Sequence, residues 1–316
     1  MHAIAGVISF TIAAFVGAQA HAQTYPSRAI NMVVPFPAGG NTDIMARALQ
    51  IEMSKAMGQT IVILNKGGAA GTLGMIDVAR AAPDGHTIAM TPNNPLTAQP
   101  HLQKLPYDMD SFRYVCLTYY APYVLIAGPK APFKTFDEFV KFTKAKSENL
   151  VYGHPGLASQ PHLGMLAVLN AIGGDGLGVP FTGAGPMAQA LLSGTVMAIA
   201  ETPAVATASN LPILAALSEE RLAALPNVPT MKELRYPANS FTAGGVVAPI
   251  NTPPAVIATL ERACAEATAS AGYKTIADRL NVEARYLPGT AFRKLFDMDS
   301  VDNAATIKRM GPAGGK

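Results

Sequence analysis

A glycine turn between an apolar segment and a helical pattern is the feature of this sequence most suited to chemistry. Residues 30–34 form a mostly apolar run typical of a buried strand, residues 35–40 read Pro-Phe-Pro-Ala-Gly-Gly, and residues 43–57 have helical periodicity. Residues 41–43, Asn-Thr-Asp, all favour the first position of a helix. The first N–H groups of a helix carry partial positive charge, so this turn suits an anion. An ordinary strand-to-helix connection has the same local pattern, so both interpretations stay open here.

Three further loops are expected near this turn, because ligands in open α/β sheets bind beyond the carboxyl ends of the strands. Residues 91–94 follow a short predicted strand, and residues 154–160 and 182–185 each precede a predicted helix. These loops offer backbone N–H groups together with side-chain hydroxyls and amides. The candidate ligand-binding residues in and around the four loops are Phe36, Ala38, Gly39, Gly40, Asn41, Thr42, Asp43, Thr91, Asn93, Asn94, Gly156, Ser159, Gln160, His162, Thr182, Gly183, Ala184 and Glu201.

None of the four loops contains an arginine. A bound carboxylate would therefore be held by N–H groups and helix dipoles rather than by a salt bridge. Charge-assisted hydrogen bonds contribute roughly 1.5–3 kcal/mol each, and helix starts facing a cleft add modestly to that. Bridging waters suit such a polar cleft, because they satisfy donors at little cost.

Several of these side chains also have a structural interpretation. Asp43 could cap its helix, bind an amine of a ligand, or do both, and capping is the favoured interpretation. His162, at the start of a helix near the cleft, is compatible with either role. Glu201 could face the cleft or pair with an arginine elsewhere. For His86, in a turn before a strand, a structural role is favoured over catalysis.

Strand and helix patterns alternate along the chain, which favours parallel sheets covered by helices on both faces. The predicted strands are residues 30–35, 59–65, 87–90, 112–119, 123–127, a segment beginning at 151–152, 196–200 and 213–216. The predicted helices are residues 43–57, 71–82, 135–146, 161–172, 184–192 and 253–271. At 316 residues the chain is long for one core, so two α/β domains are expected.

The charge balance argues against a nucleic-acid-binding protein. Charged residues make up 14% of the chain, with 24 Lys and Arg against 21 Asp and Glu, and no basic block is present. A nucleic-acid binder would carry a clustered basic excess.

The amino terminus resembles an export signal. Residues 3–17 are apolar and uncharged, and residues 20–22, Ala-His-Ala, give the small-x-small pattern of a cleavage site. We therefore expect residues 1–22 to be a cleaved signal peptide and the mature, exported chain to begin near Gln23. The segment before the apolar stretch has no Lys or Arg, so a retained anchor is the alternative.

The chain has two cysteines, Cys116 and Cys264. Export would permit a disulfide, but the separation in sequence does not give the distance in space. Without a C-x-x-C pattern or a third ligand, a metal or redox site is disfavoured. Two buried small hydrophobic residues is the favoured interpretation, and a disulfide stays open.

Several segments, in order along the chain, resemble one protein family. They are Tyr25-Pro26-Ser27-Arg28-Ala29-Ile30, the turn at 35–43, Asn65-Lys66-Gly67-Gly68-Ala69-Ala70-Gly71, Ala82-Pro83-Asp84-Gly85-His86-Thr87, Leu105-Pro106-Tyr107-Asp108, residues 179–186 and residues 225–230. They resemble the Bug family, the periplasmic substrate-binding proteins of tripartite tricarboxylate transporters. The resemblance implies a type II-like, two-lobed periplasmic binding protein, each lobe a mostly parallel sheet flanked by helices. Two crossing strands would join lobe one, residues 23–124 and 243–316, to lobe two, residues 125–242.

The resemblance also implies a function without catalysis, cofactor or metal. The protein would capture a small organic mono- or dicarboxylate by lobe closure, act as a monomer, and deliver the ligand to membrane subunits of a tripartite transporter. The loops 35–43 and 156–160 would bind the carboxylate. A ligand-binding sensor is an alternative, and a secreted hydrolase is disfavoured because no G-x-S-x-G, H-E-x-x-H or P-loop pattern is present.

Four positions depart from the family pattern. Leu157 and Ala158 stand where the family commonly has Asn and Gly, Ala243 stands where it has a pocket aromatic, and Glu201 stands where it often has Asp. We expect a larger and more apolar pocket than is typical of the family, one that could take a bulkier carboxylate, including an aromatic one.

Overall fold

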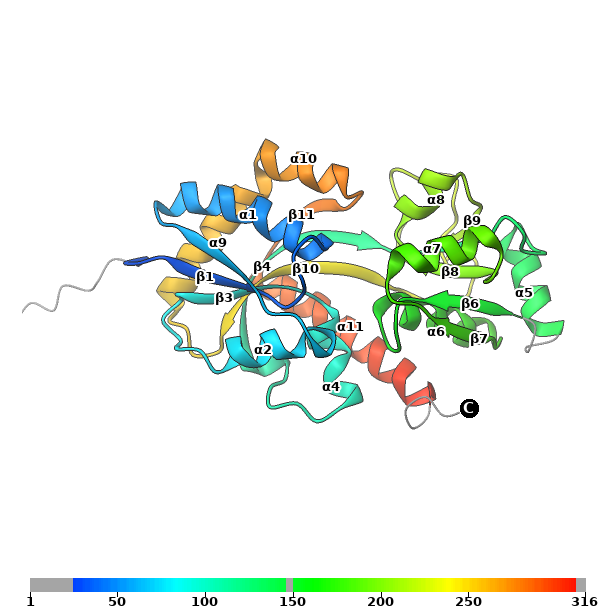
Figure 1. Ribbon diagram of the computed structural model, residues 1–316, viewed down its shortest axis with the longest axis horizontal. Helices are drawn as coiled ribbons and strands as arrows, with labels where there is room; N and C mark the ends of the chain where they lie inside the picture. The colour runs from blue at the N-terminus through cyan, green and yellow to red at the C-terminus, as the bar shows by residue number, and fades with distance from the viewer. Residues whose placement is uncertain (1–24, 146–149, 311–316) are drawn as a thin grey trace, which may run out of the picture.

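The protein consists of two α/β lobes joined by long strands, as Figure 1 shows. The structure is a computed structural model that describes residues 25–145 and 150–310. The predicted signal peptide, residues 1–22, lies outside the described residues. The expected two-lobed α/β architecture is confirmed, with helices on both faces of each sheet.

The first lobe is built on a six-stranded sheet with the strand order β11-β4-β10-β3-β1-β2. Its strands are β1 Ile30–Val34, β2 Ile61–Asn65, β3 Thr87–Pro92, β4 Phe112–Pro122, β10 Phe241–Pro249 and β11 Glu283–Pro288. Its helices are α1 Asn41–Met57, η1 Ala69–Gly71, α2 Thr72–Ala79, α3 Asn94–Thr97, α4 Gln99–Leu102, η2 Met109–Ser111, α9 Pro254–Ala269, α10 Ala271–Arg279 and α11 Gly289–Met310.

The second lobe is built on a five-stranded sheet with the strand order β7-β6-β8-β5-β9. Its strands are β5 Val124–Ala127, β6 Val151–His154, β7 Leu177–Pro180, β8 Ala198–Glu201 and β9 Ile213–Ala216. Its helices are α5 Phe136–Ala145, α6 Gln160–Ile172, α7 Ala184–Ser193 and α8 Pro203–Ser209.

The sheets are mixed, which corrects the expectation of mostly parallel sheets. Strands β1, β2 and β3 pair in parallel, and so do β6, β7 and β8. Strand β10 pairs antiparallel with β3 and β4, and β5 pairs antiparallel with β8 and β9. The reason is the passage between the lobes. One strand leaves the first lobe and another returns beside it, so the two need no helical crossover and run in opposite directions.

Alternation along the strands explains the continuous apolar runs in the sequence. Met32 and Val34 pack under α1, α9 and α10, whereas Val33 faces α2, α3 and α11 on the other side of the sheet. Successive side chains of a strand point to opposite faces, so a sheet covered on both faces needs apolar residues at nearly every position.

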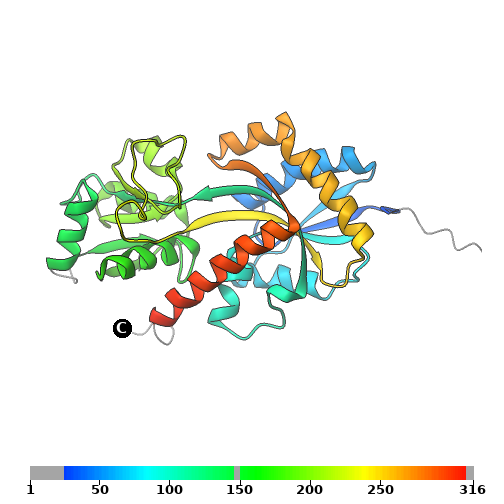
Figure 2. The same ribbon diagram turned by 180° about the vertical axis from the view of Figure 1, so that it is seen from behind.

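The chain crosses between the lobes at Tyr123 and near Ser240. The N–H of Tyr123 donates to the carbonyl oxygen of Ser240 (2.9 Å), and the N–H of Ser240 donates to that of Leu217 (3.0 Å). Helix α11 also reaches from one lobe to the other, as seen from behind in Figure 2, and packs against α6. Both sheets and one long helix therefore meet at this crossing.

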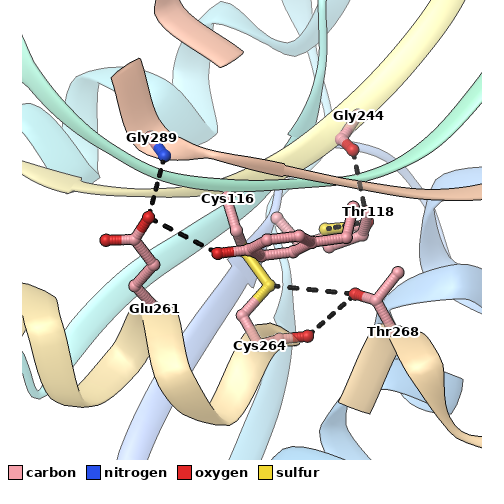
Figure 3. Close-up of a disulfide and its surroundings, with 9 residues drawn as sticks. Cys116, Thr118, Gly244, Glu261, Cys264, Thr268 and Gly289 are labelled. Atoms are coloured by element: carbon pink, nitrogen blue, oxygen red, sulfur yellow. Dashed lines mark hydrogen bonds between the residues drawn. A yellow bond between two sulfur atoms is a disulfide. The ribbon is translucent and has the colours of Figure 1, made fainter. Parts of the chain in front are cut away.

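Cys116 and Cys264 form a disulfide between β4 and α9 (Figure 3). The preference for two separate buried thiols was therefore wrong. The two Cα atoms lie 6.5 Å apart although 148 residues separate them in sequence, and both side chains are fully buried. Chain separation carries no information about this proximity, which arises because α9 packs on the sheet at β4.

Some elements differ from the sequence-based expectation. The helix predicted over 253–271 corresponds to α9, which ends at Ala269 because Ser270 has an extended conformation. The Oγ of Ser270 accepts the N–H of Tyr273 (3.1 Å) and starts a separate helix, α10. Strands β7 and β11 and helices α3, α4, α8, α10 and α11 were not predicted. Within the described ranges, no helix combines the length and apolar character needed to cross a membrane.

Candidate functional site

A cavity of about 370 Å³ lies between the two lobes, where loops from both sheets converge. It is lined by Phe36, Thr42, Ala70, Pro92, Asn93, Asn94, Gln99, Tyr123, Pro155, Gly156, Leu157, Ser159, Gln160, Pro161 and Thr242. The start of α1 comes from the first lobe and the start of α6 from the second, so first-turn N–H groups of two helices lie beside one cavity.

Part of the predicted set of candidate residues lines this cavity. The residues that do so are Phe36, Thr42, Asn93, Asn94, Gly156, Ser159 and Gln160. The residues that do not are Ala38, Gly39, Gly40, Asn41, Asp43, Thr91, His162, Thr182, Gly183, Ala184 and Glu201. Tyr123 and Thr242 line the cavity from the crossing strands and were missed, because only the strand pairing shows that this crossing forms a wall of the cavity.

Asp43 fixes the conformation of the loop 35–43 from the side that faces away from the cavity. Its Oδ2 accepts the N–H of Gly39 (2.9 Å) and the Nε of Arg47 (3.0 Å), and its Oδ1 accepts Nδ2 of Asn65 (2.8 Å). Burial alone would raise the pKa of Asp43, but these hydrogen bonds outweigh it and lower the pKa. Asp43 therefore fixes the turn through Gly39, whose φ of +87° suits glycine. It neither faces the cavity nor caps α1.

The loop before α6 is held in a similar way by His162. The N–H of Ala158 donates to Nδ1 of His162 (2.9 Å), and Nε2 lies 3.3 Å from the hydroxyl of Tyr152. Burial, with a further contribution from His154, lowers the pKa of His162 to about 3, so the ring is neutral and can accept this bond. His162 thus supports the loop and does not line the cavity.

Ser159 and Gly156 shape the part of this loop that faces the cavity. The Oγ of Ser159 donates to the carbonyl oxygen of Gly156 (2.7 Å), and Gly156 has a φ of +131°. Ser159 precedes the first residue of α6, so the N–H groups of Gln160 and His162 in the first turn have no intrahelical partner, and Pro161 between them has no N–H. The hydroxyl is committed to the loop and forms no hydrogen bond with a histidine among the described residues.

Two asparagines link the second loop to the rest of the site. Nδ2 of Asn94 donates to the carbonyl oxygen of Ala158 in the other lobe (3.0 Å), and its Oδ1 accepts Nε2 of Gln99 (3.1 Å). Asn93 is fully buried and donates to the carbonyl oxygen of Phe241 (3.2 Å). The rim of the cavity is therefore bonded across the two lobes.

The fourth loop and Glu201 lie outside the lining of the cavity. Gly183 precedes α7 with a φ of +142°. Glu201 ends β8, is buried, and accepts the N–H of Thr202 (2.8 Å). Burial raises the pKa of Glu201 to about 7, and the hydrogen bonds from Thr202 oppose this. In the described part of the chain, it forms no salt bridge with an arginine, contrary to one of its two expected roles.

The chemistry of the cavity is neutral. None of the residues that line it in the described part of the chain has a charged side chain. Its polar groups are hydroxyls, amides and backbone N–H groups, and its walls are Phe36, Tyr123, Leu157 and prolines. No group of His, Cys, Asp and Glu suited to a metal ion occurs within residues 25–145 and 150–310. Such a site can bind an anion through dipoles and an apolar body through its walls.

Comparison with known proteins identifies the family. The profile of the tripartite tricarboxylate transporter family receptor matches residues 45–311. Protein BugT of Bordetella pertussis is 36% identical over 272 residues, 83% of this chain and 82% of that protein. The ligand-free crystal structure of a TctC solute-binding protein from Polaromonas has a TM-score of 0.82 and 31% identity, covering 90% of this chain and all of that one.

A structure with a ligand is also similar. MatC from Rhodopseudomonas palustris, solved with bound malate, has a TM-score of 0.73 and 31% identity, again covering 90% of this chain and all of the other. The resemblance to the Bug family noted in the sequence is confirmed by these findings. The chain belongs to the tripartite tricarboxylate transporter receptor family and is a solute-binding protein of that family.

Proposed function

We propose that this protein captures a small organic carboxylate in the cavity between its lobes and delivers it to the membrane subunits of a tripartite transporter. The observation that carries the proposal is the pair of helix starts, α1 and α6, beside a cavity that no charged side chain lines in the part of the chain that the structure describes. The N–H groups there can hold a carboxylate by charge-assisted hydrogen bonds. The malate bound by the related MatC supports this ligand class.

The mechanism is closure of two lobes about the crossing strands. We take residues 23–124 and 243–316 as one moving unit and residues 125–242 as the other. A ligand that contacts both helix starts interacts more strongly with the closed state than with the open state, and so shifts the equilibrium toward closure. The closed form is then the species that the transporter recognises.

The ligand should carry a single carboxylate on an apolar body. Each carboxylate that enters this cavity loses hydration and meets only neutral hydrogen-bond donors among the described residues, so a second charge adds to the cost of binding. Phe36, Tyr123 and Leu157 provide apolar wall instead, and Leu157 is 53% exposed. An aromatic or branched monocarboxylate fits this lining better than a hydroxy dicarboxylate does.

The setting is periplasmic and the action is non-catalytic. The expected signal peptide and the family of exported receptors support export, and the neutral cavity supports binding rather than turnover. Fractionation of the host should recover a monomeric mature chain, starting near Gln23, in the periplasmic fraction.

The direct test is calorimetric titration of the mature protein with phenylacetate, benzoate and malate. We expect the aromatic monocarboxylates to bind more tightly than malate, with a raised melting temperature and unchanged ligand after incubation. At a hundred times the dissociation constant, the ligand should add about 2.7 kcal/mol to the free energy of unfolding. Failure of every carboxylate to bind would refute the proposal, and product formation would support the hydrolase alternative.

A further inference from the structure

Asp299 is a buried carboxylate in the middle of α11, the helix that passes from lobe to lobe. It is 5% exposed, and among the described residues no lysine or arginine forms a salt bridge with it. Its oxygens accept Oγ1 of Thr97 (2.5 Å), Nδ2 of Asn93 (2.9 Å) and Nε2 of Gln160 (3.3 and 3.4 Å). Burying a carboxylate among neutral donors is costly, so this arrangement calls for an explanation.

The donors come from opposite sides of the ligand cavity. Asn93 precedes α3 in the first lobe, Gln160 is the first residue of α6 in the second, and both line the cavity. Both side chains also donate to the carbonyl oxygen of Phe241, at 3.2 and 3.4 Å, where β10 begins. One carboxylate thus joins a wall residue of each lobe at the point where the chain crosses.

The orientation of Gln160 shows how strongly the network uses its donors. With Nε2 directed at Asp299 and Phe241, the Oε1 of Gln160 is buried without a hydrogen-bond partner within the described residues. A buried oxygen without a hydrogen-bond partner is unfavourable. The hydrogen bond from Nε2 of Gln160 to Asp299, which joins the two lobes, offsets this cost. Thr97 is held in the same cluster by Nδ2 of Asn303 (3.2 Å), one turn along α11.

We propose that Asp299 is a positioning residue of the ligand cavity: it couples the two lobes at the hinge by holding Asn93 and Gln160 in fixed orientations. It does not contact the ligand. Its ionised form accepts all of these donors with charge-assisted strength, whereas a protonated carboxyl accepts them more weakly. The coupling therefore depends on pH.

The titration of Asp299 takes place among several other ionisable groups. Burial raises its pKa to about 6, the hydrogen bonds from Thr97, Asn93 and Gln160 oppose this, and Asp302 adds to it. The other groups of the surrounding elements are His101 of α4, Tyr120 of β4, Tyr123 of the crossing, Glu219 and Arg221 after β9, and Glu283 and Arg285 of β11. Most of them line a second cavity of about 590 Å³ on the far side of the crossing strands, which Asp299 also borders.

The first test uses no ligand. Hydrogen exchange of the mature chain is compared between wild type, Asp299→Asn and the control Asp302→Asn. Asp302 borders the same second cavity, one turn further along α11. We expect Asp299→Asn to raise exchange several-fold in peptides covering 91–99 and 156–164 together, one from each lobe, and Asp302→Asn to change neither. Faster exchange only near α11 and 91–99, or no change at all, would overturn the coupling.

A substitution in the other lobe keeps the proposal testable if Asp299→Asn does not fold. Gln160→Met keeps the side-chain length and removes the bond to Asp299. We expect it to raise exchange in peptides covering 91–99, across the hinge. If exchange there is unchanged, Asp299 does not couple the lobes.

The second test measures pH dependence of binding, with phenylacetate as the probe, at roughly pH 7.5 and roughly pH 5. Wild-type affinity should fall several-fold at the lower pH, whereas Asp299→Asn should bind weakly and equally at both. Glu201→Gln, which removes the other buried carboxyl near the crossing, should keep the wild-type dependence. This arm rests on the proposed function. If phenylacetate binds no variant, the proposed function fails while hydrogen exchange still decides the role of Asp299.

Discussion

At the scale of single residues, the selectivity of the cavity follows from its neutral lining among the described residues. Because no lysine or arginine lines it within the described ranges, it cannot recognise each carboxylate of a polyanion by a salt bridge. Selectivity then depends on how well the apolar walls fit the body of the ligand. Leu157 is the clearest case, because its side chain is exposed in a loop that Gly156 and Ala158 hold in positive-φ conformations.

Replacing Leu157 by asparagine should reverse the ligand preference. The change removes apolar wall that a phenyl ring would cover, which costs about 1–2 kcal/mol of binding free energy, roughly a tenfold rise in the dissociation constant. The new amide should strengthen malate binding. Calorimetry with phenylacetate and malate measures both effects. Leu177→Asn, at an exposed leucine of β7, is the matched control and should change neither. Parallel changes for the two ligands would contradict this role of Leu157.

Ser159→Ala should weaken carboxylate binding through the loop rather than through a lost ligand contact. The substitution removes the hydrogen bond from Oγ to Gly156, worth about 1 kcal/mol, so affinity for phenylacetate should fall roughly fivefold. Ser193→Ala, at the end of α7 and outside the cavity lining, serves as the control. Equal dissociation constants for wild type and Ser159→Ala would remove this loop from the binding site.

The sequence identified the loops of the site better than the direction of their side chains. Asn93, Ser159 and Gln160 line the cavity because they follow strand ends, which the apolar pattern locates. Asp43 and His162 lie in the right loops but face away. Their directions are set by contacts with Asn65, Arg47 and Tyr152, and spacing along the chain does not reveal such contacts.

At the scale of elements, the direction of the strands and the disulfide were the least predictable features. Alternating patterns indicated most strands and helices, because most of the strands, such as β1, β3 and β5, are buried on both faces. They did not indicate strand direction, which depends on how β4, β5 and β10 pass between the sheets. The contact between Cys116 and Cys264 likewise depends on α9 packing against β4.

Removing the disulfide should destabilise the first lobe. Closing a loop of this length restricts the unfolded chain, so Cys116→Ala with Cys264→Ala should lower the free energy of unfolding by about 2–5 kcal/mol. Urea unfolding of the double variant and of the wild type measures the difference. Reduced wild type should resemble the variant in stability. Equal midpoints for oxidised and reduced wild type would show that the crosslink contributes nothing.

At the scale of the whole molecule, buried ionisable groups act on stability in opposite directions. Asp299 and Glu201 have raised pKa values, about 6 and about 7, because burial disfavours their charged forms. The folded protein therefore binds more protons than the unfolded chain between roughly pH 4 and 7, and stability falls as pH rises through that range. His162, with its pKa lowered to about 3 by burial, works the other way, because the unfolded chain binds the proton. The pH dependence of the free energy of unfolding of the wild type combines these opposing contributions. A single contribution is therefore measured as the difference between wild type and a variant that lacks one ionisable group.

The variant Glu201→Gln isolates the contribution of Glu201 to stability. Gln cannot ionise, so the variant lacks the loss of unfolding free energy that wild type shows as pH rises through about 7. A shift from 4.5 to about 7 corresponds to about 3 kcal/mol at most. Relative to the variant, wild type should therefore lose up to this amount of stability between roughly pH 5 and pH 8. Urea unfolding of both proteins across this range measures the difference, with the exposed Glu283→Gln as control. A constant difference between wild type and Glu201→Gln would mean that Glu201 is ionised throughout, and that a cation or water compensates its charge.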